Sequence, residues 1–288
     1  MYTLSIVNQK GGVGKTTLTV GLATYLHHFG YRVLVLDLDS QQNATSWMLG
    51  RHLKANEASI YDSLSTKKRR AKGDEDWPLH ELIETSETLG IDFVPANVDL
   101  SSAQAELANK PLLLRDRLEE YERIVEGKEA PERLSNGRYD FCLIDCPPSL
   151  GTLVTIALMA SQGIIVPIKA DAFSMDGLRQ LIMTARETKR LNEELGILGL
   201  VLNNLDVRFG ATNDGVQTIR DHYEDKLFET RIPTRARIFE AASYGLDLYD
   251  HAEGNDAQEI FSDFAREVIE RSGVSAPNEE TSAAGTAV

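Results

Sequence analysis

The chain has 288 residues, of which 42% are hydrophobic and 26% are charged. This is enough apolar material for a large core, so the composition excludes a disordered chain. Its net charge of −14 argues against a globally basic nucleic-acid-binding protein, although a local basic patch is still compatible with it. Two cysteines, Cys142 and Cys146, allow neither a disulfide framework nor a four-cysteine metal site, and no run approaches the ~20 apolar residues of a membrane span. We therefore expect a soluble cytoplasmic protein without a membrane partner.

Apolar runs of strand length alternate with helical patterns along the chain. The predicted strands are 4–7, 33–36, 91–94, 141–144, 164–168 and 198–202, and the predicted helices are 14–29, 112–125, 153–160, 175–195 and 216–223. Continuous apolar runs are typical of strands buried on both faces, and their alternation with helices indicates a parallel sheet. The predicted fold is therefore an α/β doubly wound, mostly parallel sheet with helices on both faces.

The domain organisation follows from where this alternation is interrupted. Charged or turn-rich stretches at about 65–80 and 127–137 are predicted to be surface insertions in a single domain that covers 1–272. Residues 273–288 are rich in Ser, Ala, Gly and Glu, so we expect a disordered tail there.

A glycine-rich segment at residues 10–17, Lys-Gly-Gly-Val-Gly-Lys-Thr-Thr, lies between the first predicted strand and the first predicted helix. The backbone N–H groups of such a loop turn inward around phosphate oxygens, and the helix adds the positive end of its dipole. In this pattern Lys15 reaches the β- and γ-phosphates, the Thr16 hydroxyl binds Mg²⁺ and Thr17 contacts the α-phosphate. The predicted cofactors are ATP and Mg²⁺, and the predicted phosphate-binding residues are Gly11, Gly12, Val13, Gly14, Lys15, Thr16 and Thr17.

The loop is a variant of the generic P-loop, which has a glycine where this chain has Gln9, and it carries an additional lysine, Lys10. This segment resembles the deviant P-loop ATPases of the ParA/MinD superfamily. Three further segments carry the resemblance: Val-Leu-Asp-Leu-Asp-Ser-Gln-Gln-Asn-Ala-Thr at 35–45, Tyr-Asp-Phe-Cys-Leu-Ile-Asp-Cys-Pro-Pro-Ser-Leu-Gly at 139–151, and a weaker match at 230–245. Ser40 stands where the family has proline. The resemblance spans about 2–268 and implies the P-loop NTPase fold.

Three carboxylates end predicted strands at the carboxyl edge of the sheet, where open α/β sheets bind ligands. By the resemblance, Asp39 is the catalytic aspartate that orients the attacking water, while Asp37 and Asp145 hold Mg²⁺ together with Thr16. The roles of Asp37 and Asp39 are interchangeable at this stage. The structural alternative is that these carboxylates cap the N-termini of helices.

Two lysines of the loop are predicted to be catalytic. Lys15 contacts the phosphates of its own chain, whereas the resemblance implies that Lys10 reaches across a dimer interface to the phosphates of the partner. This role of Lys10 implies a homodimer that forms when ATP binds, with the nucleotide sandwiched between the two chains. The alternative is an ordinary solvated lysine.

The resemblance also implies residues for the base and for DNA. Asn203 or Asn204, with Pro233, would flank adenine, although asparagine at a strand end also forms turns. Arg208, Arg235 and Arg237, with neighbouring Arg231, would form a basic face that contacts phosphates of non-specific DNA. Thr234 stands where the family often has another arginine, and an ordinary solvated surface is the alternative.

The branch of the family is inferred from absent features. The last predicted helix, 258–270, has an apolar stripe opposite an acidic face, which favours core packing over binding to anionic lipid. The P-loop begins at residue ten, which resembles the short ParA class without a preceding helix-turn-helix domain. We expect a nucleoid-associated partition ATPase, for plasmids or chromosomes, that is released from DNA when a ParB-like adaptor stimulates hydrolysis. Alternatives are a positioning ATPase for a protein cargo, such as a microcompartment or chemosensory array, and a metabolic P-loop ligase.

Overall fold

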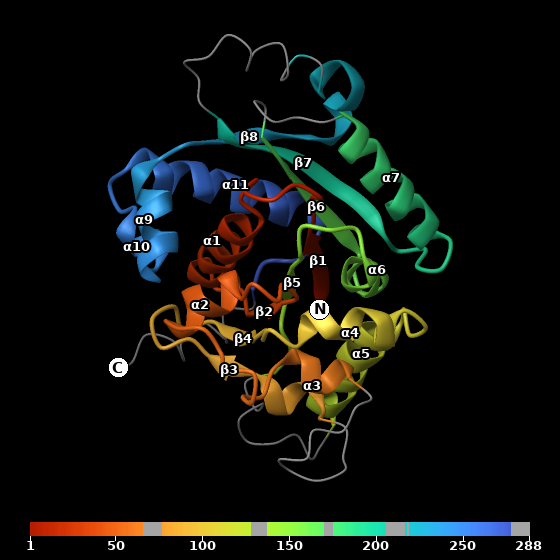
Figure 1. The fold of residues 1–288 in the computed structure, drawn as a ribbon. Helices are drawn as coiled ribbons and strands as arrows, with labels where there is room; N and C mark the ends of the chain where they lie inside the picture. The colour runs from red at the N-terminus through yellow and green to blue at the C-terminus, as the bar shows by residue number, and fades with distance from the viewer. Residues whose placement is uncertain (66–76, 128–136, 170–174, 206–216, 218, 278–288) are drawn as a thin grey trace.

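The computed structural model describes residues 1–65, 77–127, 137–169, 175–205, 217 and 219–277. They contain an eight-stranded sheet in the order β3-β4-β2-β5-β1-β6-β7-β8 (Figure 1). The strands are β1 (Tyr2–Ile6), β2 (Val33–Asp37), β3 (Glu84–Thr85), β4 (Asp92–Val94), β5 (Phe141–Asp145), β6 (Gly163–Ile168), β7 (Gly196–Leu205) and β8 (Leu227–Pro233). All paired neighbours are parallel except β3 and β4, which confirms the predicted fold class.

Helices cover both faces of the sheet (Figure 1). One layer contains α1 (Lys15–His28), α2 (Asn43–Leu49), α9 (Ala236–Tyr244), α10 (Leu248–His251) and α11 (Asp256–Ser272). The other contains α3 (Ile60–Leu64), the 3₁₀-helix η1 (Leu79–Leu82), α4 (Leu100–Leu107), α5 (Leu113–Glu126), α6 (Thr152–Met159) and α7 (Met175–Lys189). A short 3₁₀-helix, η4 (Glu224–Lys226), precedes β8. Because side chains alternate along a strand, Val33 and Val35 pack in the first layer and Leu34 and Leu36 in the second.

The register of the central strands creates the functional edge of the sheet. Asp37 at the end of β2 lies opposite Asp145 at the end of β5, and Asp145 lies opposite Ile6 at the end of β1. The chain segments that follow these three strands therefore leave the sheet side by side at its carboxyl edge. This is the edge at which open α/β sheets bind ligands.

Two strands and several helices were missed by the prediction. β8 has an interrupted burial pattern, with Glu229 and Arg231 exposed between buried residues, and β3 has only two residues. The helix predicted over 175–195 ends at Lys189, and residues 219–223 are helical within the range predicted as 216–223. The short helices α2, α3, α4, α9 and α10 carry too few turns to give a clear periodic signal.

The predicted insertions and tail are only partly described. Residues 66–76, 128–136 and 278–288 lie outside the described residues. The end of the first predicted insertion is not a surface loop, because Leu79 is buried and Trp77 packs against the core. Both side chains are apolar, so their burial in the protein interior is favourable.

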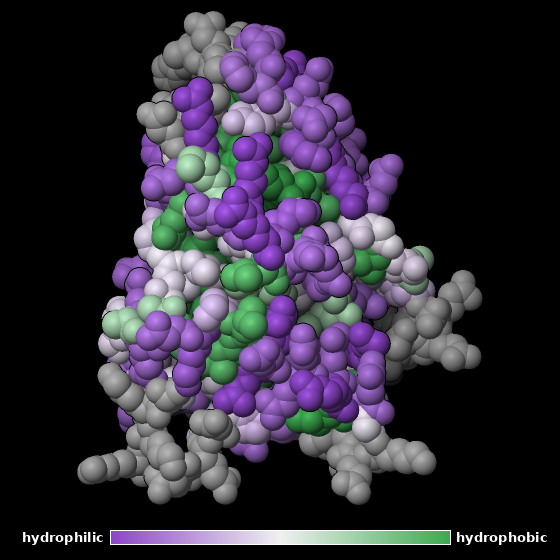
Figure 2. Space-filling view, turned by 90° about the vertical axis from the view of Figure 1, so that its right-hand side faces the viewer, coloured by the Kyte–Doolittle hydropathy of each residue, from purple (hydrophilic) through white to green (hydrophobic). Residues whose placement is uncertain are grey.

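The last helix packs into the core of the protein. Phe261, Phe264 and Val268 of α11 are fully buried, as expected for core packing. Among the helices of the described part of the chain, none has both the length and the apolar character needed to cross a membrane. On the side that carries α6 and α7, the surface is mainly hydrophilic, and hydrophobic side chains appear in small patches between polar ones (Figure 2).

Candidate nucleotide site

The glycine-rich loop connects the end of β1 to the first turn of α1. Side chains tie the start of this loop to the sheet: the Asn8 amide donates to the carbonyl of Pro167 at 2.6 Å, and its Oδ1 accepts from the backbone of Lys10 at 2.9 Å. α1 begins at Lys15, directly after Gly14, so its unpaired N–H groups face the space enclosed by the loop. The predicted strand–loop–helix arrangement is thus present.

Gly14 is required by both its backbone and its surroundings. Its φ of 85° lies in the left-handed region, which residues with a Cβ rarely adopt. A Cβ at this position would collide with the side-chain amide of Asn203. That amide donates to the carbonyl of Val13 at 2.7 Å, and Asn203 is only 4% exposed. The asparagine that was predicted to flank the base is therefore engaged with the phosphate loop.

Thr16 and Asp145 bring oxygen donors together beside the loop. The Thr16 hydroxyl donates to Asp145 Oδ2 at 2.6 Å, and Thr19, one turn later in α1, donates to Oδ1 at 3.4 Å. Burial and the nearby Asp37 carboxylate raise the pKa of Asp145, so its charged form is unfavourable without a neighbouring positive charge. Hydroxyl and carboxylate oxygens are the ligand class that Mg²⁺ prefers. The donor set therefore fits the cation that the sequence predicts.

The structure separates the two carboxylates that follow β2. Asp37 is 1% exposed, and its oxygens accept from the backbone of Asp39 at 2.9 Å and from the backbone and hydroxyl of Thr45 at 2.9 and 2.7 Å. Asp39 is 7% exposed, lines the cleft with the loop, and accepts from the backbone of Gln41 at 3.0 Å. Asp39 therefore lines the cleft, while Asp37, which is predicted to help hold Mg²⁺, also fixes the turn that carries Asp39.

Four parts of the chain line the cleft. They are the phosphate loop with the start of α1, the segment from Asp39 through α2 to the following loop, Pro148 after β5, and the end of α9. Its lining residues are Gly11, Gly12, Gly14, Lys15, Thr16, Thr17, Asp39, Gln41, Asn43, Ser46, Trp47, Gly50, His52, Pro148, Ala242, Ser243, Tyr244 and Gly245. Trp47, His52 and Tyr244 were not predicted, because only the folded chain brings α2, the loop after it and α9 to the phosphate loop.

The other predicted residues are dispersed around this cleft. Lys10 is exposed on the loop, and its carbonyl accepts from the Lys15 ammonium at 3.4 Å. Lys15 itself is 7% exposed. Pro233 ends β8 and is half-buried. The side chain of Asn204 and the whole of Arg208 lie outside the part of the chain that the structure describes.

Of the three described arginines of the predicted DNA face, Arg235 and Arg237 are paired with acids. Arg235 contacts Asp256 at 2.7 Å, and Arg237 contacts Glu240 at 3.4 Å. Each pair is at the surface, where such contacts contribute little to stability. These positions therefore present mixed charge.

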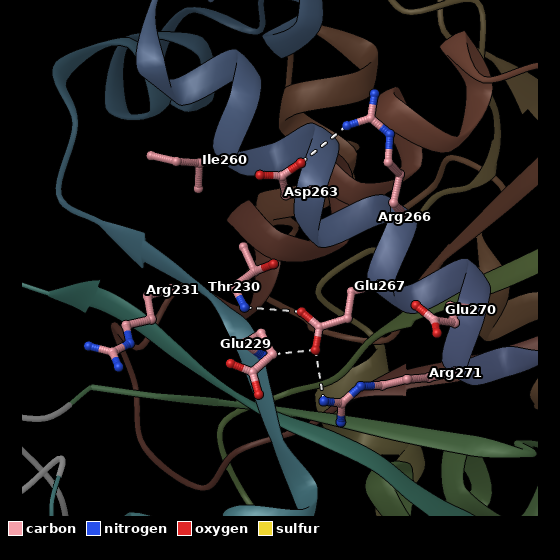
Figure 3. Close-up of a pocket in the computed structure, with 9 residues that line it drawn as sticks. All are labelled: Glu229, Thr230, Arg231, Ile260, Asp263, Arg266, Glu267, Glu270 and Arg271. Carbon is pink, nitrogen blue, oxygen red and sulfur yellow. Dashed lines mark hydrogen bonds and ion pairs between the residues drawn. The ribbon is translucent and has the colours of Figure 1, made fainter.

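A second groove lies between β8 and α11 and is built from charged side chains (Figure 3). Glu267 accepts from the backbone N–H groups of Glu229 and Thr230 at 2.8 and 3.0 Å, and it pairs with Arg271 at 2.7 Å. Because β8 is an edge strand, this carboxylate occupies donors that would otherwise be open to another strand. The contacts in this groove thus stabilise the edge of the sheet.

Comparisons with known proteins agree with this geometry. A family profile described as "AAA domain" matches residues 1–197. The chain is 36% identical to the sporulation initiation inhibitor protein Soj of Bacillus subtilis, over 92% of this chain and 97% of that protein. It is 35% identical to the chromosome-partitioning ATPase Soj of Thermus thermophilus, over 93% of this chain and 95% of that protein.

Solved structures share the fold. A cobyrinic acid a,c-diamide synthase from Mycobacterium smegmatis with bound ADP and magnesium is 26% identical, with a TM-score of 0.72 over 96% of this chain and 98% of that one. The septum site-determining protein MinD of Pyrococcus horikoshii, complexed with Mg-ADP, shares the fold, with 24% identity and a TM-score of 0.68 over 95% of this chain and 98% of that one. The family profile, the identities to the Soj proteins and the cleft together place the chain in the ParA/MinD-type family of partition ATPases.

Proposed function

We propose that this chain is a Mg²⁺-dependent ATPase that partitions DNA. It dimerises on ATP, binds DNA without sequence preference, and leaves the DNA when a ParB-like adaptor stimulates hydrolysis. The observation that carries the proposal is the convergence of Asp39, the Thr16–Asp145 pair and the glycine-rich loop on one cleft. Its relatives at 36% and 35% identity include a protein named as a chromosome-partitioning ATPase.

The roles of the residues around ATP follow from their contacts. The loop amides and Lys15 bind the phosphates, and Thr16 and Asp145 hold Mg²⁺, which neutralises charge on the β- and γ-phosphate oxygens when it is bound. Asp39, at the surface of the cleft, orients the attacking water. Asp37 acts on Asp39 through its backbone N–H and is a positioning residue.

Dimerisation is supported by the place of Lys10. Lys15 is buried at the base of the loop, whereas Lys10 is exposed at its entry. A lysine in that position suits the phosphates of a second protomer better than those of its own chain. Two loops would then face each other across two nucleotides.

The DNA surface is proposed to include Arg208, Arg235 and Arg237. Phosphate contacts by arginine give affinity that is independent of sequence and falls with salt. A cytoplasmic, nucleoid-bound protein would result. The acids beside Arg235 and Arg237 reduce the positive field of this surface.

The first test measures binding to a non-specific DNA duplex with ATP, ADP or no nucleotide across a salt series. Binding that requires ATP and falls steeply with salt supports the proposal. Lys15→Ala should abolish ATP and DNA binding together, while Asp39→Ala should retain ATP and accumulate as a dimer in light scattering. Absence of DNA binding in every nucleotide state, with ATP bound normally, would refute the DNA part.

A second candidate is an ATP-dependent amide ligase, which is favoured by the 26% identity to the cobyrinic acid a,c-diamide synthase. A ligase couples ATP cleavage to a carboxylic acid and a nitrogen donor. ATP hydrolysis by the purified chain that is stimulated by DNA and a partner protein, without any acid substrate, would exclude this candidate.

A further inference from the structure

Gln42 has an unusual backbone conformation next to the candidate catalytic turn. Its φ is 59°, and among the residues that the structure describes it is the one non-glycine residue in the left-handed region. It is also buried, with 2% of its surface exposed. A residue with a Cβ keeps such a conformation only where its surroundings impose it.

Three hydrogen bonds hold Gln42. Its N–H donates to the carbonyl of Asp39 at 2.9 Å and closes the turn over 39–42. Its carbonyl accepts from Ser46 at 2.8 Å in the first turn of α2. Its side-chain oxygen accepts from the backbone of Leu53 at 2.6 Å, eleven residues away. Gln42 thus connects the Asp39 turn to the loop that follows α2.

We propose that Gln42 is a positioning residue for ATP hydrolysis, which fixes the Asp39 turn against the loop at Leu53. The proposal rests on the role of Asp39 in orienting water. Three hydrogen bonds hold Asp39: its N–H donates to the Asp37 carboxylate, its carboxylate accepts from the Gln41 backbone, and its carbonyl accepts from the Gln42 backbone. Without the side-chain anchor the turn and α2 could tilt, and a shift of about 1 Å at a water-orienting group costs on the order of 10²-fold in rate.

The alternative is that Gln42 serves stability alone. A glycine at this position would adopt the positive φ without steric cost, so Gln42→Gly removes the unfavourable conformation together with the anchor. If Gln42 only stabilised the fold, this variant would hydrolyse ATP normally. If Gln42 positions Asp39, the variant folds well but turns over slowly.

The experiment compares kcat and KM for ATP in Gln42→Met, Gln42→Gly and Gln42→Glu, with urea unfolding of each. The methionine is similar in length but offers no acceptor oxygen, whereas the glutamate retains one. Ser86→Ala is the matched control, because Ser86 is also buried and donates to the carbonyl of Met48 near the other end of α2 at 2.6 Å.

We expect kcat to fall by about tenfold or more in the methionine and glycine variants, with KM within about twofold of the wild type, and to recover largely in the glutamate variant. Ser86→Ala should lose stability and keep kcat. Wild-type kcat in both Gln42→Met and Gln42→Gly would overturn the proposal, as would an equal loss in Ser86→Ala. Normal hydrolysis by Asp39→Ala would instead show that the role assigned to Asp39 is wrong.

Discussion

Gly14 and Asn203 form a contact that makes a quantitative prediction. Alanine at position 14 would have to adopt the φ of 85°, which costs about 1–2 kcal/mol. Its Cβ would also displace the Asn203 amide and leave the buried carbonyl of Val13 without its donor, which costs a further ~1–3 kcal/mol. Gly14→Ala should therefore lower the free energy of unfolding by about 2–5 kcal/mol.

Gly12→Ala is the matched control, because Gly12 has a φ of 72° and a Cβ there would meet no atom within 4 Å. It should lose only the backbone contribution of ~1–2 kcal/mol. Urea unfolding of the nucleotide-free protein measures both. In an Asn203→Ala background the collision is gone, so Gly14→Ala should then cost no more than Gly12→Ala. Equal losses for the two glycines in the wild type, or additive losses with Asn203→Ala, would refute the reasoning.

Three further predictions concern charged side chains away from the cleft. Glu267→Ala should lower the free energy of unfolding by about 2 kcal/mol, because two backbone N–H groups of β8 lose a charged acceptor, and Glu267→Gln should lose less in the same urea titration. Asp256→Asn should tighten ATP-dependent binding to non-specific DNA and steepen its salt dependence, because it releases Arg235 from its ion pair, as a filter-binding salt series would measure. The hydrogen bond between His28 and Asp247 raises the pKa of His28 above 6.5. The stability that this pair contributes is therefore fully present below pH 6.5 and is lost as the pH rises through the raised pKa. The stability difference between wild type and His28→Asn should accordingly shrink from pH 6 to alkaline pH.

Each of these has an outcome that contradicts it. Equal stability of Glu267→Ala and the wild type would mean that water satisfies the β8 donors. Unchanged DNA affinity in Asp256→Asn would remove Arg235 from the DNA surface. A His28→Asn difference that is constant with pH would show that the pair contributes no charge-dependent stability.

The parallel core of the fold could be predicted, whereas its edge could not. β2 and β5 are continuous apolar runs because they are buried on both faces, and a run of that kind is visible in the sequence. β8 lies at the edge, and Glu229 and Arg231 interrupt its apolar residues. Its pairing with β7 also shifts register between Leu200 and Leu202, so a simple alternating pattern does not describe it.

The phosphate loop could be predicted because its residues are adjacent in the sequence, but the difference between Asp37 and Asp39 could not. The two aspartates are two residues apart at the end of one strand, and the sequence offers the same chemistry at both. What separates them is Thr45, which donates two hydrogen bonds to Asp37 from the first turn of α2 and none to Asp39. The same hydroxyl accepts from the backbone of Ala96 at 2.8 Å, in the segment after β4, and this contact exists only once the sheet has formed.

Asn203 shows the limit of reasoning from motifs in a different way. The resemblance implies a contact with the base, and the residue type at the end of a strand is equally typical of a turn. The structure gives its amide a third use, as a donor to Val13, 190 residues earlier in the chain. Because β7 and β1 both flank β6, the ends of the two strands lie near each other, and an amide at the end of β7 can reach a loop that follows β1. The conformation of the phosphate loop therefore depends on a strand that the P-loop motif does not include.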